Sequence, residues 1–304
     1  MPYKILITDV TSALGRALEH DLERELCKLY APTLGELNWL DGAAVIEYIA
    51  ALRPDVVINT FGWDDILSSE QQALFPRVAD NVALACAPLG VPLLHFSSYK
   101  VFGTDSKSSH SEKDIPAPVS SVGQAFFAAE QAIEHSSAKA IILRLGWVIG
   151  SYGENHLTRL LNSIQTKQPI NLNARLRGAP TLLSDVARVA VALIKQIASG
   201  ADNWGVMHYC SGDALTEAEF GEQLVQLLAQ QHMLAQDANF TLLDQIPNDE
   251  PVSAVLGCRR IRDGFGVQAR SWRPSLLPVV KQWFHTQNSN AQEQDANQEF
   301  NQSS

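Results

Sequence analysis

Cysteine and histidine side chains are the first candidates for chemistry in this chain, because they bind metals and act as nucleophiles or bases. The four cysteines stand far apart in the sequence and form no C-x-x-C pair; they are Cys27, Cys86, Cys210 and Cys258. The eight histidines show no spacing typical of metal ligands. The sequence therefore predicts neither a disulfide framework nor a zinc site, and no metal is expected.

Arginines form a second chemically capable group. Arg175 and Arg177 stand in the segment ARLRGAPT, close to Gly178 and Pro180. A guanidinium donates two parallel hydrogen bonds to a phosphate, so such arginines suit a diphosphate ligand. Solvent exposure around a turn explains the same pattern equally well, and the residues alone leave both interpretations open.

A helix is expected from the segment that follows Pro118. Apolar residues recur along it at spacings of four, three and four, at Val122, Phe126, Ala129 and Ile133. Hydrocarbon can neither donate a proton nor carry a charge. This face of the helix is therefore expected to pack, and it provides no acid–base chemistry.

Short apolar runs alternate with amphipathic stretches through the first half of the chain. Strands are expected at residues 3–8, 28–32, 54–59, 91–98 and 140–150, and helices at 14–26, 41–52, 73–89 and 118–135. Asp41 is a plausible N-cap for the second helix. This alternation predicts an α/β fold with a Rossmann-type, doubly wound parallel sheet over residues 1–150.

The alternation weakens after residue 150. Residues 151–285 are expected to form mainly a smaller α/β substrate-binding lobe, with segments around 181–210 returning to the first lobe. A strong helix is expected to begin at Ser184 or Asp185, and residues 239–251 should be irregular. The polar, low-complexity tail over residues 286–304 is predicted to be disordered.

Composition excludes several classes of protein. The net charge of −10 argues against nucleic-acid binding, which needs clustered Lys and Arg. No apolar run approaches the length of a membrane span, and residues 1–8 lack the pattern of a secretory signal. With 46% hydrophobic residues the chain can bury a sizeable core. We expect a cytoplasmic protein without a membrane contact.

Several segments, taken in order and spacing, resemble the dTDP-4-dehydrorhamnose reductase family of extended short-chain dehydrogenases. They are KILIT followed by LGRAL, RPDVVIN, LLHFSSYKVFG, LRLGWVIGSYGEN, RGAPTLLSDVARV, CRRIRDGFG and SWRPSL. The resemblance implies NADP(H) in the first lobe and a nucleotide-sugar between the lobes. It also implies reduction of a 4-keto group by hydride transfer.

The resemblance places the cofactor contacts at Thr8, Ser12, Leu14, Gly15, Asn59 and Ser97. The family's phosphate loop has the pattern T-G-x-x-G-x-L-G, whereas this chain has TDVTSALG. Gly15 remains, but Asp9 replaces the first glycine and Ser12 the second. A carboxylate beside a pyrophosphate is repulsive, and a Cβ at the second position takes space that the phosphate needs. The cofactor motif is therefore degenerate: the loop either still holds a dinucleotide weakly or is a βα turn without a phosphate.

The resemblance also assigns a catalytic role to Ser98, which would orient the substrate carbonyl. The family's proton-donating Tyr and its Lys are replaced by Val122 and Phe126. Tyr99 and Lys100 do not substitute for them, because neighbours in a strand point to opposite faces. Loss of a positioned general acid alone lowers the rate by about 10²–10⁴-fold.

On the substrate side, the resemblance implies contacts from Asn155, Arg175, Arg177 and Pro180. These observations together predict a non-catalytic or strongly impaired family member that binds a nucleotide-sugar or a protein partner. The regulatory subunit of methionine adenosyltransferase resembles the same family and sets a precedent for such a role. The alternative is an active NAD(P)H-dependent reductase of a dTDP-4-keto-6-deoxy sugar in dTDP-rhamnose biosynthesis. A homodimer is compatible with either function.

Overall fold

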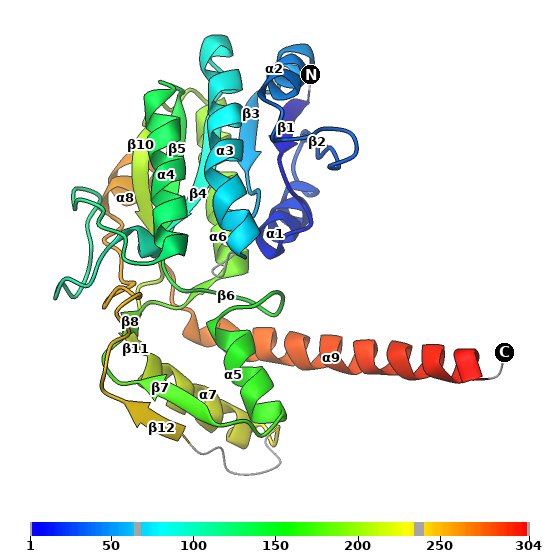
Figure 1. Cartoon of the computed structure of the whole chain (residues 1–304), viewed down its shortest axis with the longest axis vertical. Coiled ribbons are helices and arrows are strands. Elements are labelled where there is room, and N and C mark those ends of the chain that lie inside the picture. The colour runs from blue at the N-terminus through cyan, green and yellow to red at the C-terminus, as the bar shows by residue number, and fades with distance from the viewer. Residues whose placement is uncertain (1, 64–67, 234–239, 303–304) are drawn as a thin grey trace.

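The computed structural model describes residues 2–63, 68–233 and 240–302. At its centre lies a six-stranded sheet in the order β10-β5-β4-β3-β1-β2 (Figure 1). All neighbouring strands in it are parallel. They are β1 (Tyr3–Ile7), β2 (Cys27–Tyr30), β3 (Val56–Asn59), β4 (Leu93–Ser98), β5 (Ala140–Leu145) and β10 (Gly205–Tyr209). The predicted α/β fold with a doubly wound parallel sheet is confirmed.

Helices cover both faces of this sheet. Every residue of β3, β4 and β5 is buried, which explains why these strands are continuous apolar runs. Figure 1 shows α3 and α4 in front of the sheet and α6 behind it, where α6 packs beside α1. The helices of this lobe are α1 (Ala13–Leu22), α2 (Gly42–Leu52), α3 (Ser69–Cys86), α4 (Ser121–His135) and α6 (Leu183–Ala198), with short 3₁₀ turns η1 (Ala87–Leu89) and η2 (Tyr99–Val101).

A smaller lobe lies below the sheet in Figure 1 and has a core of its own. Helices α5, α7 and α9 contribute Leu161, Phe220 and Trp283 to that core, and Trp272 joins it from the residue before α9. The remaining elements of the chain are β6 (Val148–Ile149), α5 (His156–Gln165), β7 (Ile170–Asn173), β8 (Arg177–Gly178), β9 (Thr181–Leu182), β11 (Leu215–Thr216), α7 (Glu217–Gln230), β12 (Phe240–Leu243), α8 (Arg259–Phe265) and α9 (Arg273–Gln302). Between these segments, α6 and β10 return to the sheet lobe.

Local signals positioned several helix starts as expected. Asp41 is the N-cap of α2 and accepts two backbone hydrogen bonds at 3.1 Å. Ser120 caps α4 by accepting from the Gly123 N–H at 3.0 Å. Helix α6 differs from its prediction, because neither Ser184 nor Asp185 caps it. Its N-cap is Leu182, which makes no side-chain cap bond, so packing against the sheet sets the start of this helix.

Two segments have more structure than their composition indicated. Residues 240–243, inside the stretch predicted to be irregular, form β12, because β7 of the same lobe offers a parallel partner. The polar tail, predicted to be disordered, is helical through Gln302 as the continuation of α9, which Figure 1 shows running away from the body. The tail contains no Gly or Pro after Pro278, and Ala, Glu and Gln favour helix.

Gly15 allows α1 to start close against the turn that follows β1. A Cβ at this position would lie 2.1 Å from the Asp9 carbonyl oxygen and 2.7 Å from the Val10 Cα. Both contacts are with backbone, which cannot move aside without displacing the strand end. Gly15 is thus required for the close packing of strand and helix that the resemblance implied.

We expect Gly15→Ala to lower the free energy of unfolding by about 1–3 kcal/mol, although alanine is the better helix former. Urea denaturation measures this change. Gly212→Ala is the matched control, because a Cβ there meets nothing within 4 Å. Equal stability of the two variants would show that the turn tolerates the added methyl group.

Candidate functional site

The strand order reverses around β1, and in open α/β sheets ligands bind at such a point. β1 lies between β2 and β3. The crevice opens at the carboxyl ends of the strands, where the chain continues as residues 8–12 after β1 and 60–63 after β3. The cofactor-binding residues predicted from the sequence lie in or beside these segments: Thr8 and Ser12 after β1, the buried Leu14 and Gly15 at the start of α1, Asn59 at the end of β3 and Ser97 at the end of β4.

Asp9 closes the turn between β1 and α1 with its own carboxylate. Its Oδ1 accepts hydrogen bonds from the backbone N–H and the hydroxyl of Thr11, both at 2.7 Å. Ser12 is the N-cap of α1, and its Oγ accepts from the Gly15 N–H at 3.0 Å. Backbone N–H groups at this position hold the pyrophosphate in dinucleotide-binding folds. Here two of them already bond to side chains of the same turn, beside a fixed negative charge.

Thr8 and Asn59 join the ends of β1 and β3. The Thr8 hydroxyl donates to Asn59 Oδ1 at 3.0 Å and accepts from the backbone N–H groups of Thr60 and Phe61, also at 3.0 Å. Asn59 Nδ2 lies 3.1 Å from Nδ1 of His95. Burial lowers the pKa of His95 to about 3, so its ring is neutral and Nδ1 can accept. The polar side chains at the base of the crevice therefore bond to one another.

Trp63 covers the crevice from above this network. Its side chain is 3% exposed, and its Nε1 donates to the Ser97 carbonyl oxygen at 3.4 Å. The indole also contacts the edge of Phe96, with ring centroids 6.4 Å apart. The cavity that Trp63 lines together with Gly150 and Asn155 measures about 20 Å³. Pockets for small ligands typically have roughly 300–1,000 Å³, so the space beside Trp63 is too small for one. An adjoining cavity, which Ala13, Gly150 and Leu183 also line, measures about 600 Å³.

Ser97, expected to contact a cofactor, donates instead to Glu130 Oε1 at 2.5 Å. Glu130 also binds Arg144 through two hydrogen bonds, at 2.8 Å and 2.6 Å. Both charged side chains are almost completely buried. The pKa of the nearby His208 is lowered to about 3 by burial and by the charge of Arg144. The carboxylate of Glu130 is therefore the group that compensates the guanidinium in this part of the core.

Ser98, which the resemblance predicts to be the family's hydroxyl residue, has surroundings that differ from the expectation. Its side chain is buried, and its Oγ accepts from the Lys100 N–H at 3.3 Å as the N-cap of η2. Tyr99 and Lys100 thus stand in a 3₁₀ turn, whereas the sequence analysis placed them in a strand. The Lys100 ammonium lies 3.6 Å from the Glu250 carboxylate of the smaller lobe.

Val122 and Phe126 occupy the first two turns of α4. Phe126 is completely buried and meets the Phe75 ring edge-on, with centroids 5.0 Å apart. Phe75 in turn lies 5.4 Å from the His95 ring. Val122 is half-buried and packs on the same core. Hydrocarbon from α3 and α4 therefore fills the place where the resemblance expects an ammonium group.

The four residues predicted to bind substrate do not converge on one ligand. Asn155 is the N-cap of α5: its Oδ1 accepts from two backbone N–H groups and its Nδ2 donates to two carbonyls. Pro180 is buried between β8 and β9. Arg175 and Arg177 are exposed on the smaller lobe, and Arg175 lines an open cavity beside β12, away from the one that Asn155 lines.

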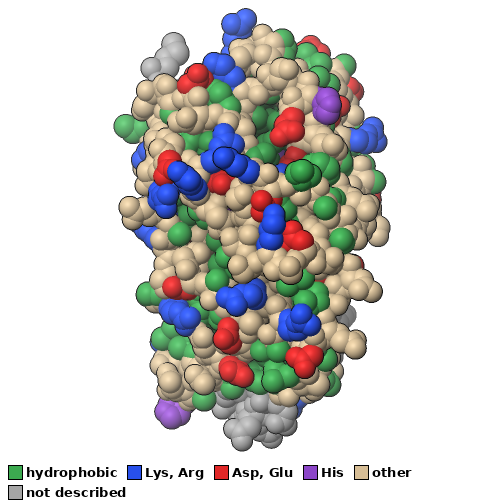
Figure 2. Space-filling view, turned by 90° about the vertical axis from the view of Figure 1, so that its left-hand side faces the viewer, with side chains coloured by type: hydrophobic (Ala, Val, Ile, Leu, Met, Phe, Trp, Pro, Cys, Tyr) green, Lys and Arg blue, Asp and Glu red, His purple; other side chains and the backbone are tan. Residues whose placement is uncertain are grey.

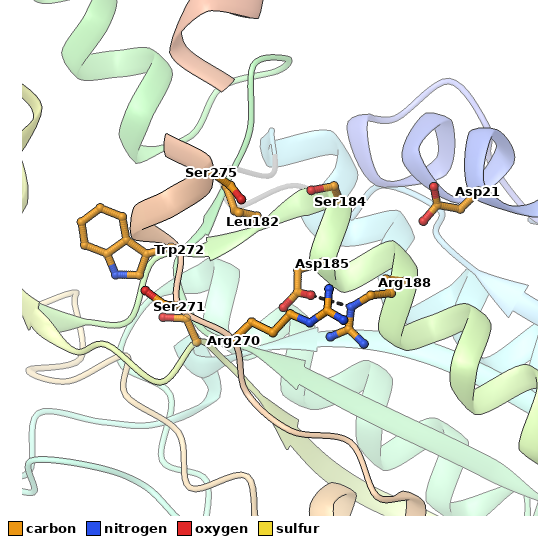
Figure 3. A pocket seen from close by; sticks show the side chains of 10 residues that line it. Asp21, Leu182, Ser184, Asp185, Arg188, Arg270, Ser271, Trp272 and Ser275 are labelled. Atoms are coloured by element: carbon orange, nitrogen blue, oxygen red, sulfur yellow. Dashed lines mark hydrogen bonds and ion pairs between the residues drawn. The ribbon is translucent and has the colours of Figure 1, made fainter. Parts of the chain in front are cut away.

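A larger cavity, of about 310 Å³, lies beside the start of α6 (Figure 3). Arg188 binds Asp185 there, with Nε to Oδ1 at 2.7 Å, and the Tyr209 hydroxyl donates to the same carboxylate. Arg270 and Ser271 line the cavity from the segment before α9. The sequence analysis did not identify this site, because its residues come from separate segments that only the fold brings together.

Two further searches cover the described residues only. Within residues 2–63, 68–233 and 240–302, no three His, Cys, Asp or Glu side chains are arranged to hold a metal ion. Across the same residues, every helix is too short or too polar to cross a lipid bilayer.

Comparison with known proteins identifies relatives over nearly the whole chain. The family model described as "RmlD substrate binding domain" matches residues 3–284. A dTDP-4-dehydrorhamnose reductase of Aggregatibacter actinomycetemcomitans is 24% identical over 290 residues, covering 91% of this chain and 98% of that protein. Methionine adenosyltransferase 2 subunit beta of Xenopus tropicalis is 27% identical over 232 residues, covering 71% and 69%.

Solved structures share the fold. A dTDP-4-dehydrorhamnose reductase of Bacillus anthracis in complex with NADP has a TM-score of 0.78 at 22% identity, covering 93% of this chain and 99% of that one. WbmG of Bordetella bronchiseptica in complex with NAD and UDP has a TM-score of 0.75 at 18% identity, covering 89% and 91%. At these identities the likeness concerns the fold alone.

The buried contact between Glu130 and Arg144 generates a prediction about stability. Glu130→Gln removes the carboxylate and leaves the guanidinium without its buried partner, so the free energy of unfolding should fall by about 3–5 kcal/mol. Urea denaturation measures it. Asp263→Asn, which disrupts the exposed ion pairs of α8, should leave the denaturation midpoint unchanged. Similar midpoints for the two variants would contradict the structural role assigned to Glu130.

Proposed function

This chain belongs to the family of the RmlD substrate-binding domain, and we propose that it is a non-catalytic member that acts in the cytoplasm by binding a protein partner. The observation that carries this proposal is the turn between β1 and α1. Asp9 and Ser12 bond there to the backbone N–H groups of Thr11 and Gly15, so a carboxylate lies where a pyrophosphate would sit. A reductase of this fold needs that space for its dinucleotide.

The chemistry of the site supports the same conclusion. Hydride transfer to a ketone produces an alkoxide, which a positioned acid must protonate. The two positions on α4 that would provide and tune this acid are the apolar Val122 and Phe126. Ser98 can donate a hydrogen bond, but the α4 positions at which the family has its Tyr and Lys provide no proton relay. The side chains of this site therefore bind and pack but do not catalyse.

A protein partner is favoured over a nucleotide-sugar for two reasons. Asn155 already uses its amide to cap α5, and Arg175 faces a different cavity from Asn155. The relative from Xenopus tropicalis is named as a subunit of a methionine adenosyltransferase, an enzyme with chemistry other than sugar reduction. The family thus includes a chain that serves as part of an assembly.

The second candidate is an active reductase of a dTDP-4-keto-6-deoxy sugar. It is favoured by the relative from Aggregatibacter actinomycetemcomitans, a dTDP-4-dehydrorhamnose reductase that aligns over 98% of its length, and by the retention of Ser98. This candidate requires the crevice to open and admit NADP(H).

Calorimetric titration with NADPH and a 340-nm assay with a dTDP-4-keto-6-deoxy sugar distinguish the two candidates. The proposal predicts no binding heat with NADPH and no NADPH consumption. The Bacillus anthracis reductase, whose structure contains NADP, is the positive control under the same conditions. Tight NADPH binding with turnover would refute the proposal. A thermal shift with dTDP-, UDP- or GDP-sugars but not with NADPH would replace the protein partner by a nucleotide-sugar.

Restoring the two catalytic side chains should not restore activity. In Val122→Tyr with Phe126→Lys, the Asp9 carboxylate and Trp63 still exclude the dinucleotide, so the 340-nm assay should remain at background. Circular dichroism must first establish that the variant folds, because its lysine enters the core beside Phe75. Reductase activity in a folded variant would mean that the loop is not the obstacle.

A further inference from the structure

Two cysteines that are distant in sequence lie in contact at the boundary between the lobes. The Sγ atoms of Cys210 and Cys258 are 3.9 Å apart, and both thiols are free. Both Sγ atoms also lie within hydrogen-bond distance of the Leu256 carbonyl oxygen, at 3.2 Å from Cys210 and 3.4 Å from Cys258. A disulfide bond is about 2.05 Å long. A shift of roughly 2 Å at the sulfur atoms would therefore join them.

The pair stands where the chain leaves and re-enters the sheet lobe. Cys210 directly follows β10, and Cys258 directly precedes α8, which packs on β10. The residues between the two cysteines include β11, α7 and β12 of the smaller lobe. A disulfide between Cys210 and Cys258 would covalently link the two segments in which the chain passes from one lobe to the other.

The two thiols differ in access. Cys210 is 2% exposed, whereas Cys258 is half-buried. The neighbours of Cys258, Gly257 and Arg259, line an open cavity of about 600 Å³ together with Lys113. Figure 2 shows the side of the molecule that lies at the left in Figure 1, where α8 is drawn, with Lys and Arg side chains among the Asp and Glu. The cavity thus brings a small reagent next to Cys258, which is the more exposed of the two thiols.

Contact between the sulfurs also changes their ionisation. The pKa of the Cys210 thiol is lowered because the Cys258 thiol donates to it, and the pKa of Cys258 is raised by the same hydrogen bond and by burial. One proton therefore leaves the pair more readily than it leaves an isolated buried thiol such as Cys86, whose pKa is raised to about 12 by burial. The thiolate is the form that exchanges with disulfides.

We propose that Cys210 and Cys258 are a redox-active dithiol, which a low-molecular-weight disulfide such as oxidised glutathione converts to an intramolecular disulfide. The proton that the pair retains passes from Cys258 to Cys210 across their contact, and the Cys258 thiolate attacks the glutathione disulfide, whose S–S bond breaks and releases one glutathione thiolate. That thiolate takes the proton from Cys210, whose sulfur then attacks Sγ of Cys258 and displaces the second glutathione. The two protein thiols lose two electrons and two protons, and both are recovered in two molecules of reduced glutathione. In the cytosol such bonds are typically transient and sensory.

The test uses the reduced full-length chain, treated with oxidised glutathione and analysed by mass spectrometry after rapid acid quenching. The wild type should lose two hydrogens, and proteolysis should yield a peptide in which Cys210 is linked to Cys258. Cys210→Ser should retain glutathione on Cys258, because the resolving thiol is missing. Cys27→Ser is the matched control, since Cys27 bonds only to the Leu22 carbonyl oxygen, and it should behave like the wild type.

Thermal unfolding of the treated wild type provides a second measurement that needs no variant. Closing the loop between the two cysteines should raise Tm by roughly 5 °C, reversibly on reduction. The proposal is refuted if no linked peptide forms, or if the glutathione adduct on Cys258 is as stable in the wild type as in Cys210→Ser. If the disulfide forms but Tm does not change, the inference that it links the two lobe-crossing segments is refuted.

Discussion

The structure depends on hydrogen bonds that close the carboxyl ends of β1 and β3. Thr8, Asn59 and the backbone after β3 bond to one another, and Asp9 holds the Thr11 N–H. Every such donor is unavailable to a phosphate, since a ligand must replace an existing bond of similar strength. Trp63 lies over this closed edge. The carboxyl ends of β1 and β3 are thus held together by the protein's own hydrogen bonds and packing.

The apolar core of α4 follows the same principle. A lysine at position 126 would place an ammonium group among buried rings, which is unfavourable unless a bound ligand or an acidic partner compensates it. Phe126 instead packs against Phe75. Functional groups that strain an empty site are often replaced by stabilising ones when the function is not required. Val122 and Phe126 pack on the core and so stabilise α4 in its position.

An ion pair and a pair of thiols lie at the boundary between the lobes. Asp185 and Arg188 pair beside a cavity at the start of α6, and Cys210 meets Cys258 a short distance along the chain from Tyr209. The backbone also crosses here, where the Ala254 N–H donates to the Arg177 carbonyl oxygen at 2.7 Å. A binding event or a covalent bond at this boundary acts on both lobes at once.

Much of the architecture was readable in the sequence because it rests on local signals. The continuous apolar runs of β3, β4 and β5, the Asp41 cap and Gly15 each express a short-range rule. The absence of an acid at Val122 and Phe126 was equally visible, since it is a matter of residue type. Other features depend on residues that are distant in the sequence. β12 forms because β7 lies beside it, and the Ser97 hydroxyl donates a hydrogen bond to Glu130. The closed crevice and the contact between Cys210 and Cys258 join segments far apart in the chain, so tertiary packing alone decided them.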